Sequence, residues 1–438
     1  MKILEKGNTK LGTAWAFYDW ANSVYNLVIS SAIFPIYYGA LFKLKGISTV
    51  LVFGYNIKKT ALIILVTAFA FLVVALISPL LSGIADFAGN KKRFMQFFCY
   101  LGALSCIGLS FFTLENLTFG IFCFFFGLVG FWGSLVFYNS YLPDIAFPEQ
   151  QDKLSAKGFS LGYIGSVILL VFNLSMVMKP ESFGILGEEA SLKAMQYSFI
   201  SVGIWWIFFS QYTFYYLPSC VKKNKVTKNV IFNGYKELKK VWHQLKENSI
   251  LKKYLQSFFV YSMAVQTVML VATYFGEQEI AWKNDDEKTL GLITSILVIQ
   301  LVAVIGAIAT SKISEKLGNI KTLIIINSIW AIICVFAFFV INPVQFYITA
   351  GFVGLVMGGI QSLSRSTYSK LLPETKDTTS FFSFYDVAEK IGIVIGMIIF
   401  ATIDQITGSM RNAIVFLALF FIIGVFLLTK VGNIVPKK

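Results

Sequence analysis

The sequence has few of the residues on which most enzyme sites depend. It contains one histidine, His243, and five cysteines whose positions show no paired spacing. A histidine-based metal or catalytic cluster is therefore excluded, and neither a zinc site nor a disulfide framework is expected. Charge is also scarce, because 14% of the 438 residues are charged, against about 25% in ordinary soluble domains. We expect no cofactor, no metal and no enzymatic activity.

Apolar residues are correspondingly abundant in the sequence. The chain is 56% hydrophobic with 44 phenylalanines, and its mean hydropathy is +0.71. This abundance excludes intrinsic disorder, and its spread along the whole chain excludes one membrane anchor attached to a soluble domain. A spanning helix needs roughly 20 residues. The composition therefore predicts an all-α polytopic membrane protein.

Apolar runs between polar loops predict twelve spanning helices. The first run carries Tyr, Asp and Asn and lacks a small-residue cleavage site, so it is not expected to be a cleaved signal peptide. The spans are expected near residues 12–40, 59–84, 94–113, 116–141, 156–178, 194–217, 251–275, 288–312, 320–341, 344–366, 380–405 and 411–430.

The positive charges fall mainly on one side of this twelve-helix scheme. The two ends of the chain and the even-numbered connections that share their side hold 27 Lys and Arg residues, the opposite side holds nine, and Lys390 lies inside a span. Because basic loops stay in the cytoplasm, we expect both termini and the loop 218–250 to be cytoplasmic. The compact loops suit a multi-pass protein of a bacterial inner membrane.

The two halves of the sequence resemble each other. Residues 82–90 recur at 311–319 with an offset of 229, and Leu-Pro-Asp at 142–144 recurs as Leu-Pro-Glu at 372–374 with an offset of 230. Such a duplication is typical of transporters in which two bundles rock around a central site. We therefore expect a six-helix bundle over 1–217, a linker over 218–250 and a second six-helix bundle over 251–438.

The linker is expected to contain an amphipathic helix at the membrane surface. Its apolar side chains recur at helical spacing, with lysines on the other faces; they are Ile231, Tyr235, Leu238, Trp242 and Leu245. A basic segment can also bind nucleic acid, but the apolar stripe favours lipid. We expect the bilayer, and no nucleic acid, as a partner.

Span one is unusually polar for a membrane helix. One face carries Tyr18, Asn22 and Tyr25, and the adjacent face carries Asp19, Ser23 and Asn26. Asp19 lies about seven residues into the span, roughly 10 Å deep, where a charge needs a partner or water. Two interpretations remain open, a polar cavity and hydrogen bonding between packed helices.

Spans ten and eleven carry the other charges that lie outside the loops. Asp386 and Lys390 are spaced i, i+4 and can pair with each other; alternatively, Lys390 binds an anionic group or forms a gate with Asp19. Arg365 lies near the cytoplasmic end of span ten, where it either contributes to gating or extends to the membrane surface.

The loop after span two resembles a motif of the major facilitator superfamily. Residues 83–93 resemble G-x-x-x-D-x-x-G-[RK]-[RK], with two residues instead of three between Gly83 and Asp86 and one extra residue, Asn90. Asp86 can cap the start of a neighbouring helix, where the helix dipole favours negative charge. In that superfamily the loop latches the two halves in one gate state, so Asp86 is either a cap alone or part of a gate.

Further motifs resemble the vacuole-effluxer-like branch of that superfamily, which includes an autophagy-linked amino-acid effluxer. They are Tyr-Asp-Trp-Ala-Asn-Ser at 18–23, Phe-Tyr-Asn-Ser-Tyr-Leu-Pro-Asp at 137–144, Gly-Tyr-Ile-Gly at 162–165 and Gly-Gly-x-Gln-Ser-Leu-Ser-Arg-Ser at 358–366 with Phe-Phe-x-x-Tyr at 381–385. The resemblance implies the major facilitator fold and efflux of small organic solutes such as amino acids. In span seven the family often has an acid and a glycine where this chain has Met263 and Ala264.

We therefore expect a monomeric secondary transporter that moves an amino acid or similar zwitterion by alternating access with proton coupling. The expected substrate-binding residues are Tyr18, Asp19, Asn22, Asn26, Tyr138, Asn139, Gln266, Gln361, Tyr385 and Lys390. Coupling or gating is expected from Asp19, Asp86, Arg365, Asp386 and Glu389. The alternatives are a permease for a lipid or peptidoglycan-derived substrate and a non-transporting membrane sensor, although the longest loop, about 33 residues, is too short for a sensor domain.

Overall fold

The computed structural model describes residues 4–47, 49–52, 54–219 and 230–432, and it is almost entirely helical. The first long helix is continuous, from α1 (Thr9–Val24) through the π-helical segment η1 (Tyr25–Ile33) into α2 (Phe34–Leu44). The other long helices are α3 (Lys59–Ala88), α4 (Lys91–Leu109), α5 (Leu117–Asn139), α7 (Pro148–Met178), α8 (Ala190–Tyr216), α10 (Ser249–Glu279), α11 (Asp285–Leu317), α12 (Asn319–Ala337), α13 (Pro343–Leu371), α14 (Thr378–Thr407) and α15 (Met410–Thr429).

The number of long helices agrees with the predicted twelve spans. Within the described residues, nine helices are long and apolar enough to cross a membrane. The other three, α4, α8 and α14, are at least 19 residues long and pack among the nine. They are more polar: α4 begins with Lys91-Lys92-Arg93, and α14 carries three charged residues of the predicted site. Their charged residues lie either at the membrane surface, as at the start of α4, or in the protein interior, as in α14.

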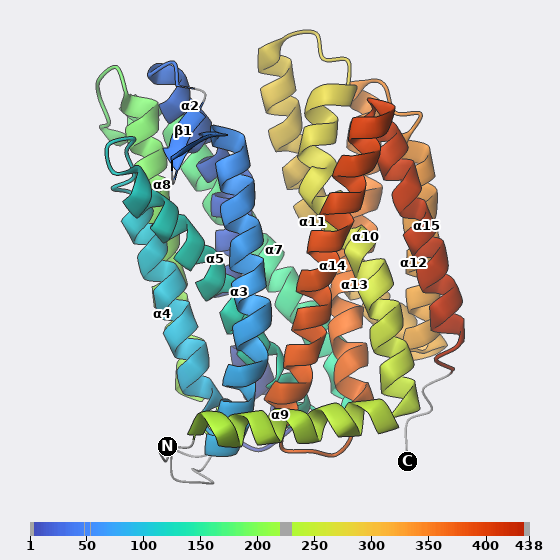
Figure 1. Cartoon of the computed structure of the whole chain (residues 1–438). Coiled ribbons are helices and arrows are strands. Elements are labelled where there is room, and N and C mark those ends of the chain that lie inside the picture. Colours follow the sequence, from blue (N-terminus) through green and yellow to red (C-terminus); the bar gives the residue numbers. More distant parts are fainter. Residues whose placement is uncertain (1–3, 48, 53, 220–229, 433–438) are drawn as a thin grey trace.

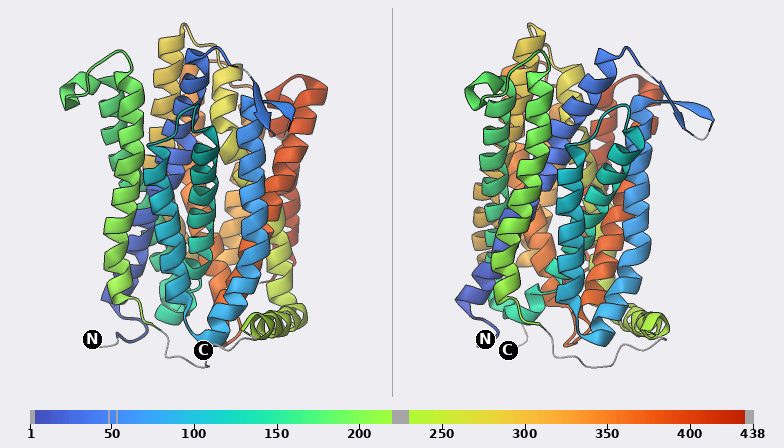
Figure 2. Two further views of the ribbon diagram at one scale, coloured as in Figure 1. Left: turned by 60° about the vertical axis from the view of Figure 1, so that its left-hand side comes forward. Right: turned by 90° about the vertical axis from the view of Figure 1, so that its left-hand side faces the viewer.

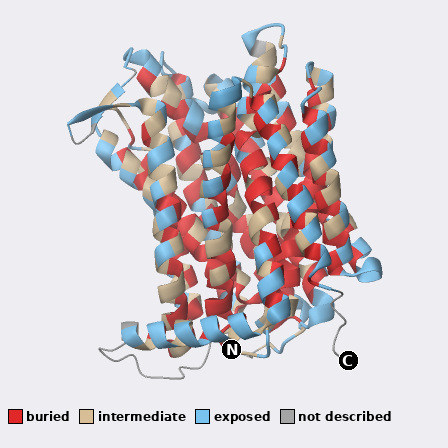
Figure 3. Cartoon of the chain, turned by 45° about the vertical axis from the view of Figure 1, so that its right-hand side comes forward, coloured by how far each residue is buried: buried red, intermediate tan, exposed pale blue. Residues whose placement is uncertain are grey.

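The helices stand side by side in two groups, as Figure 1 shows. We call α1–α8 the first half and α10–α15 the second half. One large cluster of buried apolar side chains is built from residues between Leu11 and Leu217, and the other, apart from Tyr163, from residues between Val241 and Val431. The outer faces of the helices carry exposed apolar side chains, and the interior is buried (Figure 3). This pattern is the one expected of helices whose outer surface contacts lipid.

The start of α1 and the end of α15 lie at the same end of the bundle, as an even number of crossings requires (Figure 1). We call this end the termini side and the opposite end the far side. Helix α9 (Val230–Glu247) lies across the termini side, roughly perpendicular to the long helices (Figure 2). It falls inside the predicted linker, whose residues 220–229 lie outside the described part.

Local sequence sets many of the helix ends. Asparagine side chains accept backbone N–H groups at the starts of α1, α10, α11 and α13, where such groups have no intrahelical partner; they are Asn8, Asn248, Asn284 and Asn342. At the other end, Gly89 follows α3 with φ 67° and Gly408 follows α14 with φ 68°. Glycine adopts this left-handed conformation without the steric cost of a Cβ, so each helix ends cleanly.

Two features differ from the expected scheme. Helix α7 begins at Pro148, eight residues before the predicted start of its span, and its added first turns bury the polar residues Gln151, Asp152 and Ser155 against other parts of the protein. A proline at the first helical position favours such a start. The loop after span one forms an antiparallel hairpin of β1 (Thr49–Val52) and β2 (Tyr55–Lys58) on the far side, which hydropathy alone could not predict.

Candidate functional site

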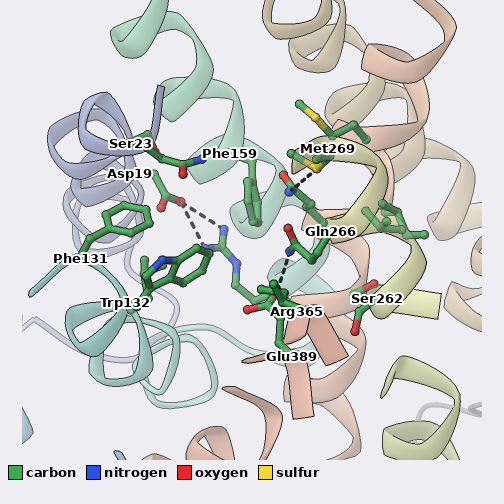
Figure 4. Close-up of a pocket in the computed structure, with 18 of the residues that line it drawn as sticks. Asp19, Ser23, Phe131, Trp132, Phe159, Ser262, Gln266, Met269, Arg365 and Glu389 are labelled. Carbon is green, nitrogen blue, oxygen red and sulfur yellow. Dashed lines mark hydrogen bonds and ion pairs between the residues drawn. The ribbon is translucent and has the colours of Figure 1, made fainter. Parts of the chain in front are cut away.

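A cavity lies between the two halves, and side chains from both halves line it (Figure 4). The cavity has a volume of about 200 Å³. Its polar lining from the first half is Asp19, Asn22, Ser23, Asn26, Ser31, Asn139, Tyr163 and Ser166, and that from the second half is Tyr261, Ser262, Gln266, Gln300, Gln361, Ser364, Arg365, Tyr385 and Glu389. The cavity is therefore polar on both walls, although it lies among helices of membrane-spanning length.

An ion pair joins the two halves at this cavity. Arg365 of α13 extends its guanidinium into the first half, where both terminal nitrogens donate to Oδ2 of Asp19 on α1, at 3.2 and 3.3 Å. Tyr138 donates its hydroxyl to the same oxygen at 2.8 Å. Both charged side chains are buried, with Arg365 3% and Asp19 4% exposed. Because a buried charge is stable only when it is paired, each of these residues depends on the other.

The Arg365 guanidinium is fully bonded by the first half. Its Nε donates to Oγ of Ser155 at 2.9 Å, Nη2 to the Ser155 carbonyl at 3.0 Å, and Nη1 to Oδ1 of Asn139 at 3.3 Å. The ring of Phe159 lies 4.2 Å from the guanidinium carbon and that of Trp15 lies 4.8 Å away. These donors and rings fix the guanidinium plane, so any anion that binds Arg365 must replace a protein partner.

A second charged cluster lies on the wall formed by α14. Lys390 bonds Oδ1 of Asp386 at 2.9 Å and Oε2 of Glu389 at 2.8 Å. The other carboxylate oxygen of Glu389 accepts from Gln266 on α10 at 2.8 Å. Trp132 of the first half covers Lys390, with the ammonium 3.8 Å from the ring centroid. Lys390 is 1% exposed, so the cluster presents Glu389, rather than Lys390, to the cavity.

Two buried polar groups of the lining lack a partner in the described part of the chain. They are Nδ2 of Asn22 and Oγ of Ser166, and both residues are 1% exposed. Buried donors are normally satisfied, so these two are free to bind water or a ligand. On the same wall, Tyr163 donates to Oε1 of Gln361 of the second half at 2.6 Å and so makes a further connection between the halves.

The termini side of the cavity is closed by further bonds between the halves. Asp86, at the end of α3, accepts the backbone N–H groups of Thr379 and Ser380 at 3.3 and 2.7 Å. These groups belong to the first turn of α14 and lack an intrahelical acceptor. The expectation that Asp86 caps a neighbouring helix is thus confirmed, and the capped helix belongs to the other half.

Asp152 and Lys91 add further bonds between the halves on the termini side. We call these contacts, together with those of Asp86, the seam. Asp152 of α7 bonds Lys370 of α13 at 2.5 Å and accepts from Asn319 at 2.9 Å. Lys91, at the start of α4, pairs with Asp144 and donates to the Thr378 hydroxyl of α14 at 3.1 Å. The contacts at Asp86, Asp152 and Arg365 all join the halves on this one side, and they must separate if the cavity is to open there.

Replacing Asp86 by alanine is expected to loosen this seam. The N–H groups of Thr379 and Ser380 then lose their acceptor, and their hydrogen exchange should accelerate about tenfold or more, as expected for the loss of a charge-assisted hydrogen bond. Hydrogen exchange of a peptide covering residues 378–384 measures the effect. The matched control is Glu315→Ala, since Glu315 stands at the repeat position of Asp86 and is exposed. Unchanged exchange in Asp86→Ala would remove Asp86 from the seam.

The structure places most of the residues expected at a substrate site around the cavity. Those that line it are Asp19, Asn22, Asn26, Asn139, Gln266, Gln361, Arg365, Tyr385 and Glu389. Tyr138 lies behind the lining and bonds Asp19. Tyr18 is buried in the first core, with its ring 5.0 Å from that of Tyr138. Lys390 and Asp386 lie behind Glu389, and Asp86 lies on the termini side.

Two of the alternatives left open by the sequence are corrected. Lys390 does not pair with Asp19, because its ammonium is held by the two carboxylates beside it on α14. Arg365 does not extend to the membrane surface, because it points into the interior toward Asp19 (Figure 4). The partner of Asp19 is therefore Arg365 and not Lys390.

Sequence reasoning missed the residues of α7 that complete the site. Ser155 and Phe159 hold Arg365, and Gly158 lets it approach, since a Cβ there would lie 2.5 Å from Oδ2 of Asp19 and 3.0 Å from Nη2 of Arg365. The predicted spans place Asp152 in the loop between residues 141 and 156. A helix that began at Pro148 would have placed Asp152, Ser155 and Phe159 at i, i+3 and i+7 on one face, which is the signal that was available.

The fold is that of major facilitator superfamily transporters. The chain superposes on the outward conformation of the superfamily transporter FucP with a TM-score of 0.70 and 13% identity, covering 97% of this chain and 99% of that one. The proton:xylose symporter XylE matches with a TM-score of 0.71 and 13% identity, over 97% and 96% of the two chains. The predicted fold class, an all-α membrane protein of this superfamily, is confirmed.

Within that superfamily, the chain belongs to the family described as vacuole effluxer Atg22 like, whose sequence model matches residues 8–433. The uncharacterized MFS-type transporter YxiO of Bacillus subtilis is 30% identical over 97% of this chain and 95% of its own. Autophagy-related protein 22 of Yarrowia lipolytica is 22% identical over 64% of this chain and 49% of its own, so this chain spans about half of that relative. The protein is a membrane transporter and not an enzyme.

Proposed function

We propose that this protein moves a small zwitterionic organic solute, such as an amino acid, by alternating access with proton coupling. The observation that carries the proposal is the Arg365–Asp19 ion pair, which joins the two halves across the cavity. Opening on the termini side requires this pair to separate, whatever the substrate. A substrate that competes for one of its members therefore couples its own binding to the movement of the halves.

A substrate carboxylate is the group that fits this competition. Because the first half occupies the Arg365 donors, an incoming carboxylate has to displace Asp19. The displaced Asp19 is then a buried carboxylate without a counter-charge, which is costly unless it takes up a proton. Substrate binding and protonation would thus occur together, and the proton would travel with the substrate although the chain lacks the acid common in span seven of the family.

The opposite wall fits the positive end of a zwitterion. Glu389 faces the cavity, where it accepts from Gln266, and the aromatic rings of Trp132 and Phe159 line the space between the walls. The unpartnered donors of Asn22 and Ser166 add acceptor-binding capacity on the same wall as Asp19. Arg365 with these donors would hold a carboxylate, and Glu389 would hold an ammonium, which favours a zwitterion over a simple sugar or a lipid tail.

The orientation follows from the charge distribution. We propose that the termini side, with α9 and most lysines, faces the cytoplasm. The bonds of Asp86, Asp152 and Arg365 then close the cytoplasmic side, and the structure represents an outward-facing state. Several curated relatives carry the name of the vacuolar family, whereas the full-length similarity to a Bacillus protein supports a bacterial inner membrane.

Thermal unfolding of the purified protein with matched ligands tests the substrate class. A ligand that binds the folded state raises the melting temperature. We expect a rise with a neutral amino acid, and a much smaller one with its amine lacking the carboxylate or its acid lacking the amine. Arg365→Gln should abolish the rise. Arg411→Gln should keep it, since Arg411 pairs with Glu279 on the far side, at 2.7 Å, away from the cavity.

The opposite results would contradict the proposal. Equal stabilisation by the amine alone and by the amino acid would show that Arg365 does not bind a carboxylate. Stabilisation by cell-wall fragments or lipids, without any by amino acids, would support the permease alternative. An unchanged rise in Arg365→Gln would separate substrate binding from the ion pair.

A further inference from the structure

Helix α9 contacts both halves at the side where the cavity is closed. It packs mainly against α3 of the first half and also touches α10 and α14 of the second half. In Figure 2 it is seen nearly end-on at the flank of the bundle, beside the end of α3. A helix at the flank lies where the headgroups of a surrounding bilayer would be, and it is not hidden beneath the centre of the protein.

The contact with α3 is made through two glycines. A Cβ on Gly83 would lie 2.3 Å from the carbonyl oxygen of Gly234, and a Cβ on Gly234 would lie 2.6 Å from Cγ1 of Ile84. The two backbones therefore touch directly. One turn or more further along α9, Val241 and Leu245 are buried, 0% and 4% exposed. This face of α9 is thus fitted to the bundle and fixes the position of the helix.

The contact with the second half lies just before α14. Lys240 bonds Asp377 and Glu237, each at 2.8 Å, and these two carboxylates raise the pKa of its ammonium above the ordinary value. Trp242 packs on Phe384 of α14, with ring centroids 5.4 Å apart. Asp377 immediately precedes the turn whose N–H groups Asp86 caps, so α9 holds the same turn of α14 from outside.

The exposed face of α9, which Trp242 borders at its contact with α14, has the composition of a membrane-surface helix. Three exposed lysines alternate with three exposed aromatic residues, and they are Lys236, Lys239, Lys246, Phe232, Tyr235 and Trp242. The ammonium of Lys236 lies 4.6 Å from the Phe232 ring centroid and that of Lys246 lies 5.1 Å from the Trp242 ring centroid. We call these six residues the basic-aromatic face. The predicted stripe is divided here, because Tyr235 and Trp242 belong to this face and Leu245 to the buried one.

We propose that the basic-aromatic face binds the headgroups of anionic phospholipids and that this binding strengthens the seam that closes the termini side. Lysines near a bilayer surface attract anionic headgroups, and aromatic rings sit at headgroup level. The lipid would hold α9 in place, and α9 would hold the first turn of α14 on Asp86. Membrane charge would thus regulate how readily the transporter opens, independently of which substrate it carries.

Hydrogen exchange in lipid nanodiscs tests this regulation without any transport assay. The full chain is placed in phosphatidylcholine nanodiscs, either without or with about 30% phosphatidylglycerol. This content gives the bilayer a negative surface potential. We expect phosphatidylglycerol to slow exchange of Thr379 and Ser380 severalfold. In the triple variant Lys236→Gln/Lys239→Gln/Lys246→Gln this slowing should vanish, while the exchange of the helix cores stays unchanged.

The control removes the same charge from the other end of the molecule. Lys43, Lys45 and Lys58 are exposed on the far side, so Lys43→Gln/Lys45→Gln/Lys58→Gln should respond to phosphatidylglycerol as the wild type does. A second measurement, microscale thermophoresis with short-chain phosphatidylglycerol, should show about hundredfold weaker binding for the α9 variant, given the contribution expected of each lysine.

Three results would overturn the proposal. One is an equal response of the α9 and far-side variants, which would show a general charge effect. Another is an equal effect of phosphatidylcholine and phosphatidylglycerol, which would exclude anionic recognition. The third is lipid binding at the α9 face with unchanged exchange at Thr379 and Ser380, which would separate the lipid from the seam.

Discussion

Arg365→Gln is expected to lower the rate of amino-acid transport about a hundredfold or more in proteoliposomes. The substitution removes the cation that both Asp19 and, in the proposed cycle, the substrate carboxylate bind. Breaking one partner of a buried pair costs about 3–5 kcal/mol, and a loss of roughly 3 kcal/mol along the transport path corresponds to about a hundredfold in rate. The initial rate of counterflow with a radiolabelled amino acid is the measurement.

Two companion variants separate this effect from misfolding. Asp19→Asn/Arg365→Gln removes both charges, so it should fold with a melting temperature closer to that of the wild type and still fail to transport. Arg411→Gln loses a comparable Arg–Glu pair on the far side and should transport at a rate within a few-fold of the wild type. Transport at the wild-type rate by Arg365→Gln would show that the pair has no part in the cycle.

Lys390→Ala is expected to reduce both stability and transport. Asp386, which is buried, and Glu389, which is partly exposed to the cavity, then lose the cation that they share. An uncompensated buried charge costs about 3–5 kcal/mol, which for a protein of this size shifts the melting temperature by roughly 3–5 °C. Thermal unfolding in detergent measures the shift, and counterflow measures the loss of transport.

The contrast with an exposed pair makes this test specific. Lys288 pairs with Asp285 at 3.0 Å near the start of α11, and the Asp285 side chain is 95% exposed. Lys288→Ala should therefore change stability by less than about 1 kcal/mol and leave transport intact. Lys390→Arg keeps a cation and should retain more stability than Lys390→Ala. Equal melting temperatures for Lys390→Ala and wild type would show that the cluster does not need its cation.

The fold could be predicted from the sequence to a large extent, because the bilayer makes hydropathy informative. Twelve apolar runs correspond to twelve long helices, six before α9 in the chain and six after it. What could not be predicted was the start of α7 at Pro148 and the hairpin of residues 49–58. Both lie outside the apolar windows, where hydropathy carries no signal and tertiary contacts decide the structure.

The sequence could predict which residues line the site, but it could not predict which of the charged residues form ion pairs with each other. Polar and charged residues inside predicted spans, such as Asp19 and Glu389, do line the cavity, since the membrane tolerates them only there. The sequence offered two cations for Asp19, and nothing in the spacing showed that Arg365 extends across the interface while Lys390 is held locally. Pairing between distant spans depends on how the two halves meet, and single-sequence patterns do not encode that relation.

The two halves also repeat their design with different chemistry on the termini side. Asp86 of the first half caps α14, whereas its repeat position, Glu315, is exposed. Near Glu315, the acidic residue that joins the two halves is Asp152 of α7. It bonds Asn319 and Lys370 of the second half. The contacts between the halves on the termini side are therefore unequal, which the repeated sequence alone did not indicate.

Distance measurements between spin labels on the two halves test alternating access most directly. The described free cysteines are buried, so labels can be placed at exposed positions after Cys220→Ser. One pair joins Glu149 and Lys316 on the termini side, and the other joins Lys43 and Lys283 on the far side. With substrate or in Arg365→Gln, the first pair should gain a longer distance while the second gains a shorter one. Distances that stay fixed, or that lengthen on both sides together, would contradict alternating access around the Arg365–Asp19 pair.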